Sequence, residues 1–323
     1  MKFKQTQVIV LANQKGGCGK TTSAISIAAA FNKLGYSVAL VDTDPQCNAT
    51  TSFGIDPDTL YNEGKLSLLD VYIQKRAAID VQLGFGERFD NRLFVVPGNK
   101  NLNAVGPRLD LEIQVALSAP GSAEVDADDY KNEQRARLRN SIESLRGVHD
   151  VVIIDTPPNL DLLMTTALVA ADWFIIPVFP SGFDLQGLEI LTRTINKIRE
   201  KYNPSLQLAG VLLGNYDKSA KLDSQIHGFL TTKFGDNAVF QTTIGRSVRM
   251  RELTVTGTTV FEHEPARAQA EQFLSLVREM INRASKGPNT VKPLPKLEEV
   301  VEQVSATPNT FTVTPEMLEV GNG

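Results

Sequence analysis

The chain has only two cysteines, Cys18 and Cys47, and no long uninterrupted run of apolar residues. Two cysteines at these positions provide neither a disulfide framework nor a CxxC metal pair. No apolar run reaches the roughly 20 residues that a membrane helix requires. The first apolar segment starts at about residue 7, so we also expect no signal peptide. These absences predict a soluble cytoplasmic protein.

The chain is also short of positive charge, with a formal net charge of −4 over 323 residues. This acidity is local: residues 110–145 carry −4 and residues 287–323 carry −3, which leaves +3 for the remainder. Because nucleic-acid binding depends on a local basic patch, the overall charge does not exclude DNA. The candidate DNA-binding cations are Lys218, Lys221, Lys233, Arg246, Arg249 and Arg251. A second basic stripe, Arg193, Lys197 and Lys201, is more typical of a solvated helix face.

What the sequence does contain is a glycine-rich segment, KGGCGKTT, at residues 15–22, directly after an apolar stretch at 8–12. Glycines let backbone N–H groups converge on a polyphosphate, while Lys20 can reach the terminal phosphates and the Thr21 hydroxyl can bind Mg²⁺. The segment therefore predicts a phosphate-binding loop. Its candidate nucleotide-binding residues are Lys15, Gly16, Gly17, Cys18, Gly19, Lys20, Thr21 and Thr22.

Lys15 departs from the usual phosphate-loop pattern, which has glycine at this position. A second cation at a site already served by Lys20 has no evident task within its own subunit. Farther along the chain, Asn215 lies at the end of a predicted strand, where it either hydrogen-bonds adenine or is a turn residue.

Short apolar runs alternate with helical patterns along the chain. Continuous apolar runs are typical of parallel strands buried on both faces, and active residues collect at the carboxyl ends of such strands. We therefore expect an α/β fold, a single P-loop NTPase domain with a mainly parallel twisted sheet flanked by helices on both faces. The predicted strands are 7–12, 37–42, 93–97, 150–155, 173–178 and 208–215.

Helices are predicted at 21–34, along a buried side marked by Leu188, Leu191, Ile195 and Ile198, and along one marked by Phe273, Val277, Met280 and Ile281. The domain is expected to cover residues 1–286, with an insertion at about 110–145. Within that insertion Arg135, Arg137 and Arg139 indicate a surface helix, with a partner site as the alternative. Residues 287–323 are rich in Pro, Thr and Glu and are expected to form a flexible tail.

Three segments together resemble the ParA/MinD family of ATPases. Residues 15–22 resemble its deviant Walker A motif, KGGxxKT/S, and residues 151–158, VVIIDTPP, resemble its Walker B motif. Residues 44–50, DPQCNAT, resemble the DPQGNAT segment of the ParA branch, with Cys47 in place of glycine. The resemblance covers about residues 6–285 and implies ATP and Mg²⁺ as ligands.

The resemblance also implies roles for single residues. Lys15 would cross a homodimer interface to the ATP of the partner subunit, and Asp44 would orient the attacking water. Asp155 would serve the Mg²⁺ site through a water, and Asp42 would support the metal shell. The catalytic candidates are thus Lys15, Lys20 and Asp44, and the metal candidates are Thr21, Asp155 and Asp42.

ParA-type proteins bind non-specific DNA as ATP dimers and are released when a ParB-like adaptor stimulates hydrolysis. The resemblance therefore implies a nucleoid-associated ATPase that positions plasmid or chromosomal DNA, without the N-terminal helix-turn-helix domain of larger relatives. Residues 245–251 resemble an IPRNVRL-type segment near the nucleotide and dimer interface, which leaves DNA contact there open.

Other functions need features that the sequence lacks or does not specify. A MinD-like membrane ATPase needs a basic amphipathic C-terminal helix, whereas residues 310–323 are acidic. A nitrogenase-iron-protein-like carrier needs cluster cysteines beyond Cys47. A small-molecule ligase or kinase does not require Lys15 together with Asp44. An McdA-like ATPase for protein cargo such as carboxysomes stays open, because it would use the same switch.

Overall fold

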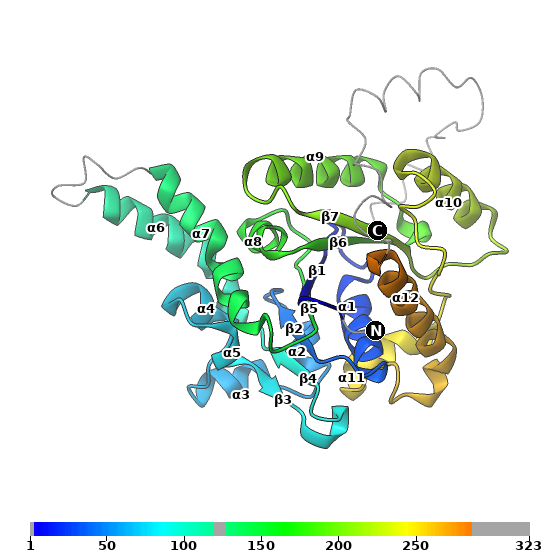
Figure 1. Ribbon diagram of the computed structural model, residues 1–323, viewed down its shortest axis with the longest axis horizontal. Helices are drawn as coiled ribbons and strands as arrows, with labels where there is room; N and C mark the ends of the chain where they lie inside the picture. The colour runs from blue at the N-terminus through cyan, green and yellow to red at the C-terminus, as the bar shows by residue number, and fades with distance from the viewer. Residues whose placement is uncertain (1–2, 119–126, 286–323) are drawn as a thin grey trace, which may run out of the picture.

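A seven-stranded sheet forms the centre of the protein, in a computed structural model that describes residues 3–118 and 127–285 (Figure 1). The strand order is β3-β4-β2-β5-β1-β6-β7, and only the β3–β4 pair is antiparallel. The strands are β1 (Gln7–Leu11), β2 (Val38–Asp42), β3 (Leu83–Gly84), β4 (Leu93–Val96), β5 (Val151–Asp155), β6 (Trp173–Val178) and β7 (Gln207–Leu213).

The six strands predicted from apolar runs are confirmed, with ends that differ by at most two residues. Every residue of β2 and β5 is buried, as expected for strands covered on both faces. Strand β3 was not predicted, because two residues carry no periodic signal. The order of the strands brings the ends of β1, β2 and β5 together at one edge of the sheet.

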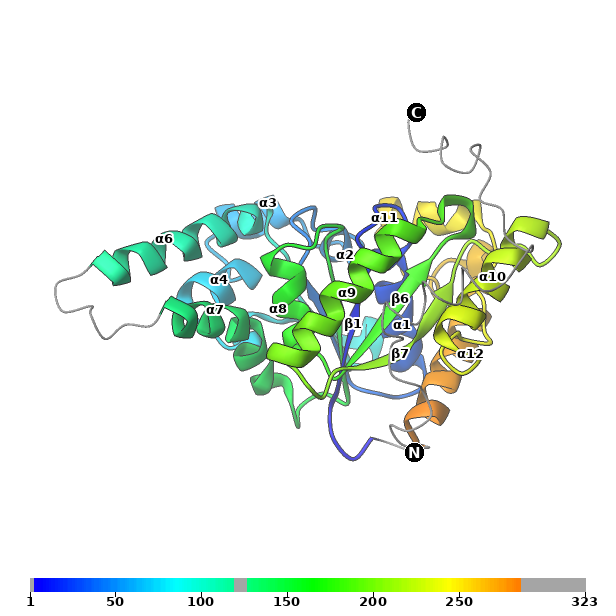
Figure 2. The same cartoon turned by 90° about the horizontal axis from the view of Figure 1, so that it is seen from above.

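Helices cover both faces of the sheet, which confirms the predicted fold class (Figures 1 and 2). Strand β1 shows the two layers: Val8 and Val10 pack into one core, whereas Ile9 and Leu11 pack into the other. The first core is closed by α4 (Leu68–Gln74), α7 (Ala127–Ile142), α8 (Leu162–Ala170), α9 (Leu185–Lys201) and α10 (Lys221–Phe234). The second is closed by α1 (Lys20–Lys33), α2 (Asn48–Thr51), α11 (Glu252–Thr256) and α12 (Arg267–Ser285).

The buried sides predicted for α9 and α12 are confirmed. Leu188, Leu191, Ile195 and Ile198 are all buried on α9. Their opposite face presents Arg193, Lys197 and Lys201 to solvent, which agrees with a solvated helix face. On α12, Phe273, Val277 and Met280 are buried and Ile281 is partly buried. The remaining short helices are α3 (Pro57–Asn62) and α5 (Ala78–Val81).

Helices α6 (Val105–Ser118) and α7 project from the body of the protein as a pair (Figures 1 and 2). They contain most of the described part of the 110–145 segment, and residues 143–145 form a short turn after α7. Residues 119–126 and the expected tail at 287–323 lie outside the described residues. The expectation of a surface role is wrong for Arg137, which is buried. Its guanidinium donates to Tyr72 O at 2.6 Å and to the Glu112 carboxylate at 2.7 Å. Arg139 is exposed, as expected.

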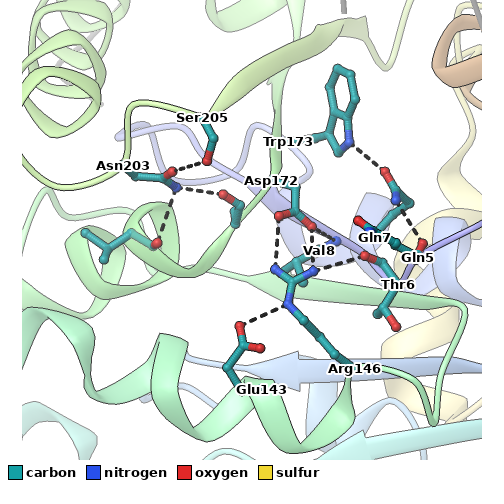
Figure 3. Close-up of polar contacts among 12 residues, drawn as sticks. Gln5, Thr6, Gln7, Val8, Glu143, Arg146, Asp172, Trp173, Asn203 and Ser205 are labelled. Atoms are coloured by element: carbon teal, nitrogen blue, oxygen red, sulfur yellow. Dashed lines mark hydrogen bonds and ion pairs between the residues drawn. The ribbon is translucent and has the colours of Figure 1, made fainter. Parts of the chain in front are cut away.

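A polar network holds together the amino-terminal edge of the sheet, where β1 and β6 begin (Figure 3). Arg146 Nη2 lies 2.9 Å from Asp172 Oδ1, and its Nη1 donates to Thr6 O at 3.0 Å. The other carboxylate oxygen, Asp172 Oδ2, accepts from Val8 N at 2.8 Å. Because the predicted active residues follow the carboxyl ends of the strands, this network lies at the opposite edge and serves the fold.

Candidate functional site

The predicted phosphate-binding loop connects β1 to α1, and its glycines have the geometry that such a loop requires. Gly17 and Gly19 have φ values of 72° and 84°, in the left-handed region that favours glycine. A Cβ on Gly19 would lie 2.5 Å from the ring of Phe179, so this residue must also be small. Helix α1 starts at Lys20, so its N-terminal amide groups and positive dipole end face the loop.

Asn13 fixes the entrance of this loop, although the sequence analysis did not single it out. Its side chain is buried, with Nδ2 donating to Pro177 O at 2.7 Å and Oδ1 accepting from Lys15 N at 3.0 Å. The loop is therefore attached to the end of β6. No sequence signal marks Asn13, because the partner that attaches it to β6, Pro177 O, is 164 residues away in the chain.

The two lysines of the loop lie in different environments. Lys20 is buried, and its Nζ donates to Lys15 O at 3.0 Å, so the ammonium group folds over the loop. Lys15 is exposed, and its Nζ donates to the carbonyl of Gly182, which lies just beyond β6. Only Lys20 is thus enclosed by its own loop, while the charge of Lys15 remains at the protein surface.

Asp155, the last residue of β5, has a buried carboxyl group that lacks a partner. It is 0 % exposed, and no hydrogen bond of ordinary geometry reaches either carboxylate oxygen. Burial raises the pKa of Asp155 well above its ordinary value and the charge of Asp42 adds to this, whereas the Thr21 hydroxyl and Lys20 oppose it. A buried carboxylate beside a hydroxyl is a suitable place for a hard cation.

Asp42 lies directly beside Asp155 in the sheet register, at the end of β2. Unlike Asp155, it is fully hydrogen-bonded: Oδ2 accepts from Thr50 N at 2.8 Å and from Thr50 Oγ1 at 2.6 Å, and Oδ1 accepts from Asp44 N at 3.2 Å. Burial is the main reason that the pKa of Asp42 is raised to about 6. These contacts position residues 44–50, and the metal role predicted for Asp42 remains a prediction.

Asp44 begins a turn that the structure holds tightly. It is 6 % exposed, and its Oδ1 accepts from Gln46 N at 2.9 Å. Cys47 has a φ of 55°, so the position where the resembled motif has glycine is left-handed here too. The thiol is buried, and burial raises its pKa to about 12. Cys47 therefore acts as a small buried residue, at the cost of an unfavourable backbone conformation.

A cavity of about 870 Å³ opens between the phosphate-binding loop and residues 244–250. Thr21 and Thr22 of the loop line it, and so does Asn215. Asn215 has a φ of 50° and directly follows β7 and Gly214. The structure thus brings Asn215, 193 residues away in sequence from Thr22, to the same cavity as the loop.

The structure separates the basic residues that the sequence grouped as DNA-binding candidates. Lys218 and Lys221 are exposed around the start of α10. Arg249 is exposed and lies 2.8 Å from the carboxylate of Glu252. Arg251 ends a short helical turn, and its side chain is outside the described part of the structure.

Two further cations of that group have other roles. The prediction that Lys233 is a candidate cation for a DNA-binding patch is wrong, because its side chain is buried and pairs with Glu189 at 3.3 Å. Arg246 lines the cavity itself.

Two features are absent from the residues that the structure describes. No helix within them is long and apolar enough to cross a membrane. Among residues 3–118 and 127–285, no group of three or more His, Cys, Asp or Glu side chains is placed to hold a metal ion. A cation at Asp155 would therefore need oxygen ligands from a bound phosphate or from water.

Comparison with known proteins gives consistent matches. Residues 6–208 match the protein family described as an AAA domain. The chromosome partitioning protein ParA of Caulobacter vibrioides is 33 % identical over 88 % of this chain and 97 % of its own length. The chromosome-partitioning ATPase Soj of Thermus thermophilus is 32 % identical over 86 % of this chain and 96 % of its own.

Solved structures show the same fold. A cobyrinic acid a,c-diamide synthase from Mycobacterium smegmatis with bound ADP and magnesium has a TM-score of 0.66 at 27 % identity, over 90 % of this chain and 100 % of that one. The ATP complex of a Cyanothece McdA variant has a TM-score of 0.66 at 19 % identity, over 90 % and 99 % of the two chains.

Proposed function

Because the chain belongs to the ParA/MinD family of P-loop ATPases, we propose that it is a ParA-type positioning ATPase that dimerises around ATP and binds non-specific DNA. The observation that carries this proposal is the exposed Lys15, whose ammonium group lies outside the loop that encloses Lys20. A phosphate-binding loop serves one nucleotide with one lysine. A second lysine, at the protein surface, is therefore placed to contact the nucleotide of another subunit.

Different residues of the site have different roles in binding and hydrolysing ATP. The amide groups of the loop and Lys20 hold the β- and γ-phosphates, and Thr21 with Asp155 would hold Mg²⁺. When bound, this ion neutralises charge on the phosphates. Asp44 lies at the same edge of the sheet as Asp155, where it orients the attacking water. Phosphoryl transfer depends mainly on positioning and electrostatics, so this set is sufficient for slow hydrolysis.

Lys15 would link hydrolysis to assembly. In the single subunit it is hydrogen-bonded to Gly182 O, a neutral partner that a phosphate can replace. When two subunits meet face to face, each Lys15 would leave Gly182 and contact the triphosphate of the other subunit. The dimer is then stable only while the triphosphate is intact, and hydrolysis dissolves it.

DNA binding would follow from dimerisation, since two copies of a weak basic patch act together. The exposed cations Lys218 and Lys221, together with Arg249 and Arg251, are the proposed phosphate contacts. A ParB-like adaptor would stimulate hydrolysis and release the protein from DNA. The protein would then be cytoplasmic and nucleoid-associated, and it would position plasmid or chromosomal DNA.

Gel shifts of random-sequence DNA with ATP, ADP and no nucleotide test this proposal. We expect a shift with ATP alone, which weakens steeply as salt is raised because phosphate contacts release counterions. The double variant K218A/K221A should reduce the shift without changing nucleotide affinity. A parent protein that gives no ATP-dependent shift at low salt would contradict the proposed DNA-binding switch.

A further inference from the structure

Arg246 lines the cavity and connects Asn215, which also lines it, to Asp223 of α10. Its Nε donates to Asn215 O at 3.3 Å, and its Nη2 lies 3.3 Å from both carboxylate oxygens of Asp223. From these contacts we propose that Arg246 is a positioning residue for the nucleotide base, which acts by holding Asn215, and that it is not a DNA contact. This inference rests on the ATP site of the proposed function and on no property of the DNA surface.

Asn215 needs such support because its backbone is in an unfavourable region. Its φ of 50° is left-handed, which a non-glycine residue adopts at an energetic cost. The neighbouring amides are fixed, with Gly214 N donating to Val178 O at 2.9 Å and Tyr216 N donating to Ile244 O at 3.0 Å. The carbonyl of Asn215 is held by Arg246. Asn215, which lines the cavity, therefore has a fixed backbone from which its side chain extends.

Asp223 determines the position of Arg246. Its side chain is only 1 % exposed, and its Oδ2 also accepts from Asp217 N at 2.8 Å. A buried carboxylate needs a cation, and Arg246 is the cation paired with it among the described residues. The guanidinium is thus committed to a protein partner. A residue that must neutralise a buried carboxylate is poorly suited to exchange partners with DNA phosphates.

The segment that carries Arg246 is itself attached to the core. Gly245 N donates to Gln272 Oε1 of α12 at 2.9 Å, and Gly245 forms a parallel bridge with Tyr216. Arg249, only three residues later, shares none of these contacts and does not line the cavity. The two arginines of one basic segment therefore have different roles, and Arg249 is the matched control for Arg246.

The test compares R246A, R246K, D223N and the control R249A by titration calorimetry with ATP and with GTP, each with Mg²⁺. We expect R246A to weaken ATP binding about tenfold, the loss typical of a charge-assisted hydrogen bond. The preference for ATP over GTP should shrink with it, because Asn215 no longer has a fixed position. R246K keeps the charge but cannot bridge both partners, so it should resemble R246A. R249A should bind both nucleotides like the parent.

Further measurements separate this role from general destabilisation and from DNA contact. D223N should also weaken ATP binding. The double variant R246A/D223N should lose less binding free energy than the two single variants lose together, because the residues act as one unit. If R246A does not fold, as judged by circular dichroism, R246K and D223N carry the test.

The proposal is overturned if R246A and R246K keep parental ATP and GTP affinities. It is also overturned if R246A weakens the DNA shift as R249A does at an ATP concentration that saturates both variants. Should the parent bind no DNA, the DNA switch fails while the nucleotide comparison still decides the role of Arg246.

Discussion

The substitution D155N tests the buried acid at the centre of the site. In the absence of nucleotide, Asp155 is fully buried and its carboxylate lacks an ordinary hydrogen bond. An uncompensated buried charge costs about 3–5 kcal/mol, and an unpaired amide in its place costs about 1–3 kcal/mol. D155N should therefore stabilise the nucleotide-free protein by about 2 kcal/mol at pH 7.5. The unfolding entropy of a domain of this size is about 0.6 kcal/mol/K, so that difference raises Tm by about 3–4 °C.

The sign of the pH dependence follows from the raised pKa of Asp155. A carboxyl group whose pKa is higher in the folded state favours folding below its unfolded pKa of about 3.9, and this contribution is lost as pH rises through the folded value. The advantage of D155N should consequently be largest at alkaline pH and should shrink as the solution is acidified.

Urea unfolding followed by the fluorescence of Trp173, the single tryptophan, measures the effect. With Mg²⁺ and ATP the parent should become more stable than D155N, because only the parent gains the stabilisation that Mg²⁺ adds. Asp161, which accepts hydrogen bonds from two amides at the start of α8, supplies the control. D161N should behave like the parent, since Asn caps a helix as well as Asp does. A D155N protein that is less stable than the parent without nucleotide would refute the reasoning.

Three further changes give distinct outcomes. D44A should bind ATP with parental affinity but hydrolyse it at least tenfold more slowly, because the attacking water loses its acceptor; parental turnover in a phosphate-release assay would rule out this role. G19A should lose ATP binding and about 1–3 kcal/mol of stability, since its Cβ would lie 2.5 Å from the ring of Phe179 at a φ of 84°; intact binding by calorimetry would show that the loop can adjust. R137A should lower stability by about 3 kcal/mol in urea unfolding, because Arg137 is a buried ion-pair partner; a loss below 1 kcal/mol would mean that its contacts are weak.

The sequence was sufficient to predict the sheet, because strands buried on both faces are continuous apolar runs. It also predicted which strand ends meet, and the register pair Asp42 and Asp155 confirms that the two aspartates lie together. Strand β3 was not predicted, because a strand of two residues is too short to show a hydrophobic pattern. Arg137 was taken as a surface residue because its partners, Tyr72 O and Glu112, come from separate helices that only the tertiary fold brings together.

The basic residues near the C-terminal part of the domain show where sequence reasoning stops. Arg246 and Arg249 belong to one short basic segment, and local sequence does not distinguish them. Their difference depends on Asp223, a buried acid 23 residues before Arg246 in the chain. Likewise, nothing local indicates that Asn13 holds the phosphate-binding loop through Pro177 O. Long-range partners of this kind are visible only in the three-dimensional structure.

Sedimentation of K15Q with Mg²⁺ and a non-hydrolysable ATP analogue tests most directly whether Lys15 acts on the nucleotide of a second subunit. The parent and the surface control K218Q should sediment as dimers, whereas K15Q should remain a monomer that still binds the analogue in calorimetry. K15Q that forms as much dimer as the parent would contradict the account.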